Sequence, residues 1–257
     1  MKRMLKSSAM WLTHKLGIAQ SAGTLSRDAQ AYWSDEASDE FQYKSHWKAG
    51  MPAEAWDGVG ADHFALYEQS ARMLNHPRPV KSIVEWGCGG GCNAVRFARE
   101  CDRFYGVDVV AASLDECEKQ LKSAGPAEFS GVLITIDDPE SAVTNIADPC
   151  DFFLCTYVFE TLPTREMGLR ILRVARQLLA PDGFAIIQIK YATDEWRTRS
   201  RTWGYRRNIA NMTTYRIEEF WESCTQAGLH PKAVTLVPKQ PLVRDERYGY
   251  FVVGRQS

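Results

Sequence analysis

Three glycines in alternating positions follow a short apolar run and precede a helical pattern. Gly87, Gly89 and Gly91 come directly after "SIVEW", and helical periodicity begins at about Asn93. Glycine permits positive φ angles and lets a ligand approach the backbone without a Cβ in the way. A helix that opens there offers unpaired N–H groups and the positive end of its dipole. This pattern is typical of a turn that binds a ligand.

Two acidic residues narrow the choice of ligand. Asp108 ends "FYGVD", the next predicted strand, where a carboxylate can accept hydrogen bonds from both hydroxyls of a ribose. Glu85 lies two residues before the first glycine, where its charge would repel a pyrophosphate but suits an ammonium group. The spacing Gly-x-Gly-x-Gly also departs from the Gly-x-Gly-x-x-Gly of dinucleotide folds. Together these features point to S-adenosylmethionine.

The elements that must position these residues alternate between strands and helices. We expect strands at 81–87, 103–110, 131–136, 151–158 and 184–191, and helices at 61–74, 93–100, 113–124, 164–179 and 213–228. Ser113 and Glu116 have the spacing of a capping box. Strands at 232–239 and 248–255 suit an antiparallel pair that completes the sheet.

This alternation predicts an α/β fold with a doubly wound, mostly parallel, Rossmann-like sheet of seven strands, a terminal antiparallel pair and an N-terminal helical cap. We expect residues 1–78 to form the helical segment or lid and residues 79–257 to form the Rossmann-like domain. A basic and aromatic insertion at 191–215 interrupts that domain.

At this point the chain resembles the class I S-adenosylmethionine-dependent methyltransferases. The resemblance covers roughly residues 80 to 192 and rests on "VEWGCGGG", "YGVD", "DFFLCTYVFETLP" and "VARQLLAPDGFAIIQI", in that order. It implies that Glu85 and the glycine turn hold the amino-acid end of the cofactor, that Asp108 holds the ribose, and that Val109 lies beside the adenine. Trp86 departs from the small or aliphatic residue usual before the first glycine. The full implied set is Glu85, Trp86, Gly87, Cys88, Gly89, Gly91, Asp108, Val109, Asp137 or Asp138, Thr156 and Tyr157.

A hydroxyl acceptor needs a base near the transferred methyl group, because its proton must leave as the new bond forms. The base should lie on an element that covers the carboxyl ends of the strands. Candidates are His46 and His63 before the first strand, and Tyr157 and Glu160 after the fourth. Each also has a structural interpretation: the histidines as packed or surface residues, and Glu160 as a favourable charge at a helix start.

The basic and aromatic insertion at 191–215 gives the strongest indication of the methyl acceptor. Guanidinium groups there would bind phosphate or carboxylate, and aromatic faces would stack on a sugar or base. The sequence therefore favours an anionic sugar or a glycan end as acceptor, although a solvated basic loop explains the same residues. The candidate substrate-binding residues are Tyr191, Arg197, Trp203, Arg206 and Arg207.

We therefore expect a methyltransferase that methylates a hydroxyl of a small or glycan-like, anionic substrate. Two alternatives stay open: N-methylation of a small amine, and a non-catalytic protein that binds S-adenosylmethionine and serves as a partner.

The remaining expectations concern partners and location. The net charge of −1 gives no general attraction to nucleic acid, and the five histidines show no metal-ligand spacing, so we expect a small-molecule or glycan substrate and neither nucleic acid nor a metal. The seven cysteines are expected to be buried thiols of a cytoplasmic protein. Basic residues 1–18 could form a helix on a membrane surface, or one packed on the domain, and no transmembrane segment is expected. The oligomeric state is open.

Overall fold

The computed structural model describes residues 19–255 and places one seven-stranded sheet at the centre of the molecule. The strand order is β3-β2-β1-β4-β5-β7-β6, with β7 antiparallel to both of its neighbours and the other adjacent pairs parallel. This arrangement confirms the predicted doubly wound, mostly parallel sheet with a terminal antiparallel pair. The strands are β1 (Val80–Trp86), β2 (Cys101–Asp108), β3 (Glu128–Leu133), β4 (Cys150–Cys155), β5 (Leu179–Lys190), β6 (Leu229–Gln240) and β7 (Asp245–Arg255).

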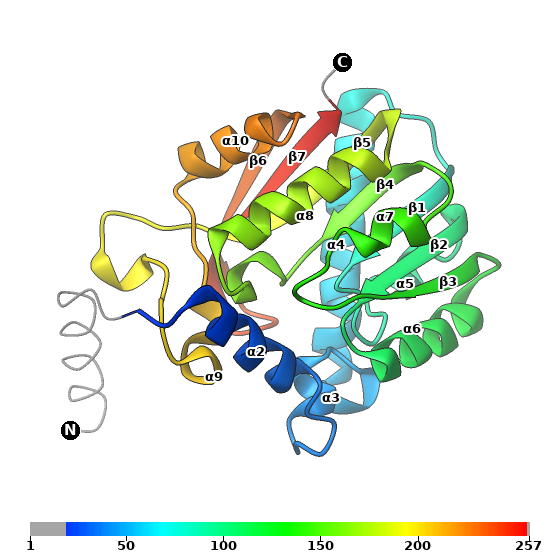
Figure 1. The fold of residues 1–257 in the computed structure, drawn as a ribbon. Coiled ribbons are helices and arrows are strands. Elements are labelled where there is room, and N and C mark those ends of the chain that lie inside the picture. Colours follow the sequence, from blue (N-terminus) through cyan, green and yellow to red (C-terminus); the bar gives the residue numbers. More distant parts are fainter. Residues whose placement is uncertain (1–18, 256–257) are drawn as a thin grey trace.

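Helices cover both faces of the sheet, as the two main hydrophobic clusters show. One cluster joins the sheet to α7, α8 and α10, and the other joins it to α4, α5 and α6. In Figure 1, α8 and α7 lie in front of the strands and α4 lies behind them. These helices are α4 (Ala53–Leu74), α5 (Ala94–Phe97), α6 (Ala111–Ala124), α7 (Ser141–Asn145), α8 (Arg165–Leu178) and α10 (Ile217–Gln226).

Alternation along the central strands explains why both faces are apolar. Phe152 of β4 lies in the cluster with α4 and α5, and the next residue, Phe153, lies in the cluster with α8. Successive side chains of a strand point to opposite faces, so a continuous apolar run is buried twice. The strands that look uniformly hydrophobic in the sequence are therefore the middle of the sheet.

Helix α6 begins earlier than its sequence suggests. The predicted capping box at Ser113 is wrong, because the helix runs from Ala111 and its N-cap is Val110. Ser113 is buried inside the first turn, where its hydroxyl accepts a hydrogen bond from the Trp47 indole at 3.4 Å. Helix α8 begins as its pattern predicts, since the Thr164 hydroxyl accepts from the Met167 N–H at 3.2 Å.

Short helices gather beyond the carboxyl ends of the parallel strands (Figure 1). One group comes from the N-terminal part, a second comes from residues 191–215, and one short helix follows β4. They are α2 (Ala22–Trp33), α3 (Phe41–Lys44), η1 (Lys48–Gly50), η2 (Phe159–Thr161), η3 (Trp196–Thr198), α9 (Tyr205–Asn208) and η4 (Ile209–Asn211).

These helices are joined to one another above the sheet. The Trp33 indole donates to the Tyr205 hydroxyl at 3.0 Å, and that hydroxyl donates to the Thr161 carbonyl at 2.7 Å. We call residues 22–50 the lid, because they cover the edge of the sheet where the glycine turn lies. The division at residue 78 stays a prediction, and residues 1–18 lie outside the described part of the chain.

Candidate functional site

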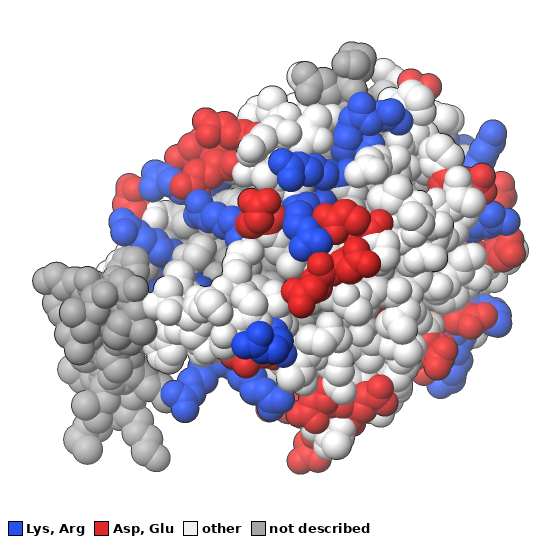
Figure 2. Space-filling view, viewed as in Figure 1, with Lys and Arg blue, Asp and Glu red and all other residues white. Residues whose placement is uncertain are grey.

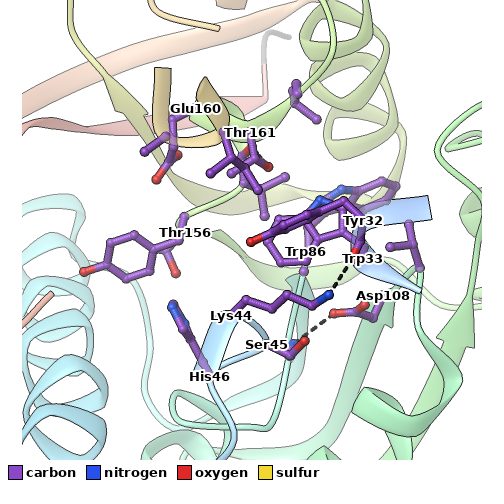
Figure 3. Close-up of a pocket in the computed structure, with 18 of the residues that line it drawn as sticks. Tyr32, Trp33, Lys44, Ser45, His46, Trp86, Asp108, Thr156, Glu160 and Thr161 are labelled. Atoms are coloured by element: carbon purple, nitrogen blue, oxygen red, sulfur yellow. Dashed lines mark hydrogen bonds between the residues drawn. The ribbon is translucent and has the colours of Figure 1, made fainter. Parts of the chain in front are cut away.

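A cavity of about 500 Å³ lies between the lid and the carboxyl ends of β1, β2 and β4. Figure 3 shows Asp108 beside Lys44 and Ser45 at one side, and Glu160 and Thr161 at the other. The predicted cofactor and acceptor residues that line it are Trp86, Gly87, Gly89, Asp108, Val109, Thr156, Tyr157, His46 and Glu160. The structure thus brings together residues separated by more than a hundred positions in the chain.

The glycine turn has two functions, only one of which the sequence analysis anticipated. Gly87 and Gly89 line the cavity with φ angles of +74° and +49°. A Cβ on Gly89 would lie 2.5 Å from the carbonyl oxygen of Ser45, and the Gly90 N–H donates to that oxygen at 2.8 Å. The turn therefore admits the backbone of the lid as well as offering bare backbone to a ligand.

Asp108 ends β2 at the cavity wall. One of its carboxylate oxygens accepts from the Gly89 N–H at 3.0 Å and the other from the Val110 N–H at 3.0 Å. Burial raises the pKa of Asp108 to about 6, although these backbone N–H groups favour the ionised form. A carboxylate oxygen has two lone pairs, so each can still accept a hydroxyl from a ligand in the cavity.

Glu85 lies behind the turn, not among the residues that line the cavity. It is 2% exposed, and its Oε1 accepts from the Asn93 amide at 2.6 Å. Its Oε2 is buried and has no hydrogen-bond partner within residues 19–255. Burial raises the pKa of Glu85 to about 8. A buried carboxyl with one unused oxygen is a place for a cationic or hydrogen-bonding group of a ligand.

Glu85→Gln is expected to stabilise the ligand-free protein increasingly as the pH rises. Between its ordinary pKa of 4.5 and about 8, the buried Glu85 holds a proton that the unfolded chain has released. The free energy of unfolding of the wild type therefore falls with rising pH in this window. Glutamine keeps the bond to Asn93 and removes the titration. The free energy of unfolding of Glu85→Gln, relative to that of the wild type, should therefore increase by at least about 1 kcal/mol from pH 5 to pH 8.

Denaturant unfolding at several pH values measures this effect, with Glu222→Gln on the exposed face of α10 as the control. A difference between Glu85→Gln and the wild type that stays constant with pH would contradict the burial argument.

Besides Glu85, four residues of the implied cofactor set are not among those that line the cavity. Cys88 is buried on the far side of the turn, where its sulfur would lie 2.9 Å from a Cβ on Gly106. A Cβ on Gly91 would lie 3.1 Å from the backbone of Cys117, so this glycine serves packing against α6. Asp137 accepts from Arg170 through its backbone carbonyl at 2.9 Å. The four residues are Cys88, Gly91, Asp137 and Asp138.

The acceptor end of the cavity holds two buried oxygen atoms without hydrogen-bond partners among the described residues. Glu160 is 3% exposed, and its Oε1 accepts from the Gln188 amide at 3.4 Å, while its Oε2 has no partner. The Tyr157 hydroxyl is likewise buried and unpaired. Burial raises the pKa of Glu160 to about 7, and the nearby Lys190 charge opposes the shift. Glu160 is thus poised to change its protonation state near neutral pH.

The two candidate histidines have different surroundings. His46 lines the cavity, has a positive φ of +53°, and its ring centroid lies 5.3 Å from that of Tyr157. His63 is 2% exposed, does not line the cavity and is bonded at both ring nitrogens to Asn93 and Tyr250. Burial lowers the pKa of each to about 4, so both are neutral at pH 7.

Sequence reasoning missed the group that supports Glu160. The Gln188 side chain accepts from the Tyr157 N–H at 2.6 Å, and the 2%-exposed Lys190 pairs with Asp245 at 2.5 Å. The Tyr248 hydroxyl donates to Asp245 at 2.8 Å. The signal was present, because Gln188 and Lys190 are polar residues in the otherwise apolar "FAIIQIK". Polar side chains at the carboxyl end of a buried strand indicate a site.

The insertion residues that we expected to bind the acceptor do not line the first cavity. Arg206 pairs with Asp35 of the lid at 3.3 Å and lies over the Tyr32 ring. Arg206, Arg207 and Trp203 line a second hollow of about 530 Å³, and Tyr191 and Arg197 line neither cavity. The insertion reaches the first cavity through Tyr205, Ile209 and Ala210 instead.

The structure also shows the state of the cysteines and the distribution of surface charge. All seven cysteines are buried and free. Among residues 19–255 we find no cluster of side chains that could hold a metal ion. No helix in this part of the chain has the length and apolar character to cross a membrane. The face in Figure 2 shows Lys and Arg interspersed with Asp and Glu, without a large patch of one sign.

Comparisons with solved structures show what fold this is. A S-adenosylmethionine-dependent methyltransferase from Clostridium acetobutylicum is similar with a TM-score of 0.58 at 10% identity, over 82% of this chain and 94% of that chain. The CcbJ methyltransferase from Streptomyces caelestis has a TM-score of 0.58 at 13% identity, over 89% and 99%. The N-methyltransferase NodS from Bradyrhizobium japonicum has a TM-score of 0.54 at 15% identity, over 76% and 97%. No curated protein matches the chain in sequence.

The fold is that of the class I S-adenosylmethionine-dependent methyltransferases. The sequence supports the same class, because the model of the methyltransferase-domain family matches residues 63–233, well over half of the chain. The chain therefore belongs to this family, and S-adenosylmethionine is its cofactor.

Proposed function

We propose that this methyltransferase methylates a hydroxyl oxygen of a small acceptor that carries no anionic group, with Glu160 as the base. The observation that carries the proposal is the unpartnered Oε2 of Glu160, buried at the cavity wall. A buried acceptor without a partner is costly unless a ligand satisfies it. A hydroxyl that donates to this oxygen would be held, and its proton would have a destination.

The residues at the other side of the cavity fit the cofactor. Asp108 has free acceptor capacity for the ribose hydroxyls, and the unused oxygen of Glu85 lies directly behind the turn assigned to the amino-acid end. Gly87 and Gly89 leave the turn without side chains at the wall. When bound, S-adenosylmethionine supplies a methyl group already activated by a positively charged sulfur. The protein then has to align the acceptor, exclude water and receive a proton.

Glu160 is suited to receive that proton. A pKa of about 7 lets a carboxyl be ionised in part of the population and still hold a proton at neutral pH. Gln188 fixes its orientation through Oε1, and the Gln188 carbonyl oxygen is itself held by the Tyr157 N–H. His46 lines the same cavity as a neutral imidazole and is the second candidate base.

The charges at the wall do not favour the anionic sugar that the sequence suggested. Among the described lining residues the carboxylates outnumber the cations, since only Lys44 is basic. The Lys44 ammonium already donates to the backbone carbonyls of Tyr32 and Asp35. The lining carboxylates are Asp39, Glu40, Asp108, Glu160 and Asp245. An acceptor with a phosphate or carboxylate would be repelled.

The same carboxylates support a second candidate, N-methylation of a small amine. An ionised Glu160 would hold an ammonium group, and the aromatic rings of Tyr157 and Tyr248, 5.4 Å apart, would contact it. An amine must lose its proton before it can attack, so Glu160 would still serve as the base.

A matched set of acceptors tests the proposal. The compounds share one scaffold and differ only in a hydroxyl, an amine, a carboxylate or a phosphate at one position. We expect release of S-adenosylhomocysteine and an O-methyl product with the hydroxyl compounds. Turnover confined to amines would favour the second candidate. Turnover confined to phosphorylated or carboxylated compounds would contradict both, as would tight binding of NAD in place of S-adenosylhomocysteine.

A further inference from the structure

A chain of buried polar side chains leads from behind the glycine turn to β7. It consists of Glu85, Asn93, His63 and Tyr250, which are 2%, 2%, 2% and 4% exposed. The links are Glu85 Oε1 to Asn93 at 2.6 Å, Asn93 to His63 Nδ1 at 2.8 Å, and His63 Nε2 to Tyr250 at 3.3 Å. Three of these residues come from β1, α4 and β7, and Asn93 immediately precedes α5.

We infer that His63 is a positioning residue. Through Asn93 it holds the Glu85 carboxyl behind the glycine turn and the Thr156 hydroxyl at the cavity wall, and so fixes the part of the site that takes the amino-acid end of the cofactor. The inference rests on the cofactor site assigned under the proposed function. His63 itself does not line the cavity, so it acts through its neighbours and not on the reacting atoms.

The direction of each hydrogen bond follows from the available donors. The Asn93 amide nitrogen donates both to Glu85 Oε1 and to the Thr156 hydroxyl at 3.3 Å, which fixes which way the amide points. Its oxygen therefore faces His63, and Nδ1 must carry the proton. Nε2 is then an acceptor, and the Tyr250 hydroxyl donates to it. Burial keeps this imidazole neutral, consistent with a pKa of about 4.

In this arrangement the amide oxygen of Asn93 depends on a single described side chain. Both amide hydrogens are used at the cofactor side, toward Glu85 and the cavity-lining Thr156. The only described side chain that holds its oxygen is His63. Without the Nδ1 donor, the buried amide oxygen is unsatisfied, and rotation of the amide to find a donor would remove the hydrogen bond to Glu85.

Two conservative variants separate the two nitrogens of His63. In His63→Asn the amide nitrogen can stand where Nδ1 stood, whereas in His63→Gln the amide can reach only the place of Nε2. We expect His63→Asn to bind S-adenosylhomocysteine within about threefold of the wild type. His63→Gln and His63→Ala should bind it about tenfold more weakly, because the bond to Asn93 is lost. Isothermal titration calorimetry measures these affinities.

A truncated ligand shows whether the loss of affinity is confined to the amino-acid end of the cofactor. 5′-Methylthioadenosine has the adenosine part but lacks the amino-acid end, so its affinity should be the same in all three variants and the wild type. His230→Ala, at an exposed position on β6, is the matched control for loss of a histidine.

The outcomes distinguish failure of this inference from failure of the proposed function. If the wild type binds neither ligand, the proposed function is wrong. If the wild type binds both, but His63→Asn is as weak as His63→Ala, or both ligands weaken together with the melting temperature, His63 has a packing role only and the inference is overturned.

Discussion

Glu160→Gln is expected to lower kcat by about 100- to 10,000-fold, the usual contribution of a general base, while the affinity for S-adenosylhomocysteine stays within about twofold. Glutamine has nearly the same shape and can still accept from Gln188 through its oxygen, so the site keeps its geometry. It cannot take a proton from the acceptor. The loss should therefore appear in the chemical step and not in cofactor binding.

The pH dependence provides a second measurement of the same role. A base must be ionised to act, and the pKa of Glu160 is raised to about 7 by burial. We expect kcat/KM of the wild type to increase with pH and to level off above about 7, which gives the pH profile an acid limb. In Glu160→Gln this limb should be absent.

The matched control is Glu166→Gln, an exposed acid in the first turn of α8. If Glu166→Gln loses activity equally, the loss is not specific to position 160 and the role of Glu160 as base is contradicted. A Glu160→Gln enzyme that keeps its rate and its pH dependence would move the role of base to His46.

The fold could be predicted because its signals are local. The apolar runs that became β1, β4 and β5 and the amphipathic face of α8 each lie within fewer than twenty residues. The glycine turn and Asp108 were also identifiable, because in a parallel sheet the carboxyl ends of neighbouring strands meet at one edge. Register confirms this, since Asp108 ends β2 beside β1, which ends at Trp86.

The contents of the cavity depend on long-range contacts, and these could not be predicted. The pairing of Arg206 with Asp35 joins residues 171 positions apart and takes that guanidinium out of the expected acceptor site. The partners of His63 are 30 and 187 positions away, and they decide that it supports the site from behind. Residue type alone suggests what a side chain can do, whereas its packing decides which ligand it can reach.

Asp108→Ala is expected to weaken the binding of S-adenosylhomocysteine by about 1–3 kcal/mol, the value of hydrogen bonds to a charged group. The variant loses the acceptors for the ribose, and the Gly89 and Val110 N–H groups lose their partner. Asp108→Asn keeps the shape and one acceptor, so its loss should be smaller. Calorimetric affinities measure both, and Asp102→Ala, exposed near the start of the same strand, is the control.

The two ligands make this prediction independent of the one for His63. Asp108 is assigned to the ribose, which S-adenosylhomocysteine and 5′-methylthioadenosine share, so Asp108→Ala should weaken both to a similar extent. His63→Gln and His63→Ala should weaken only the ligand with the amino-acid end, because the groups that His63 holds through Asn93 lie at the turn and not at the ribose. If Asp108→Ala binds both ligands as the wild type does, the ribose does not lie at the end of β2, and the orientation of the cofactor in the cavity must be reversed or displaced.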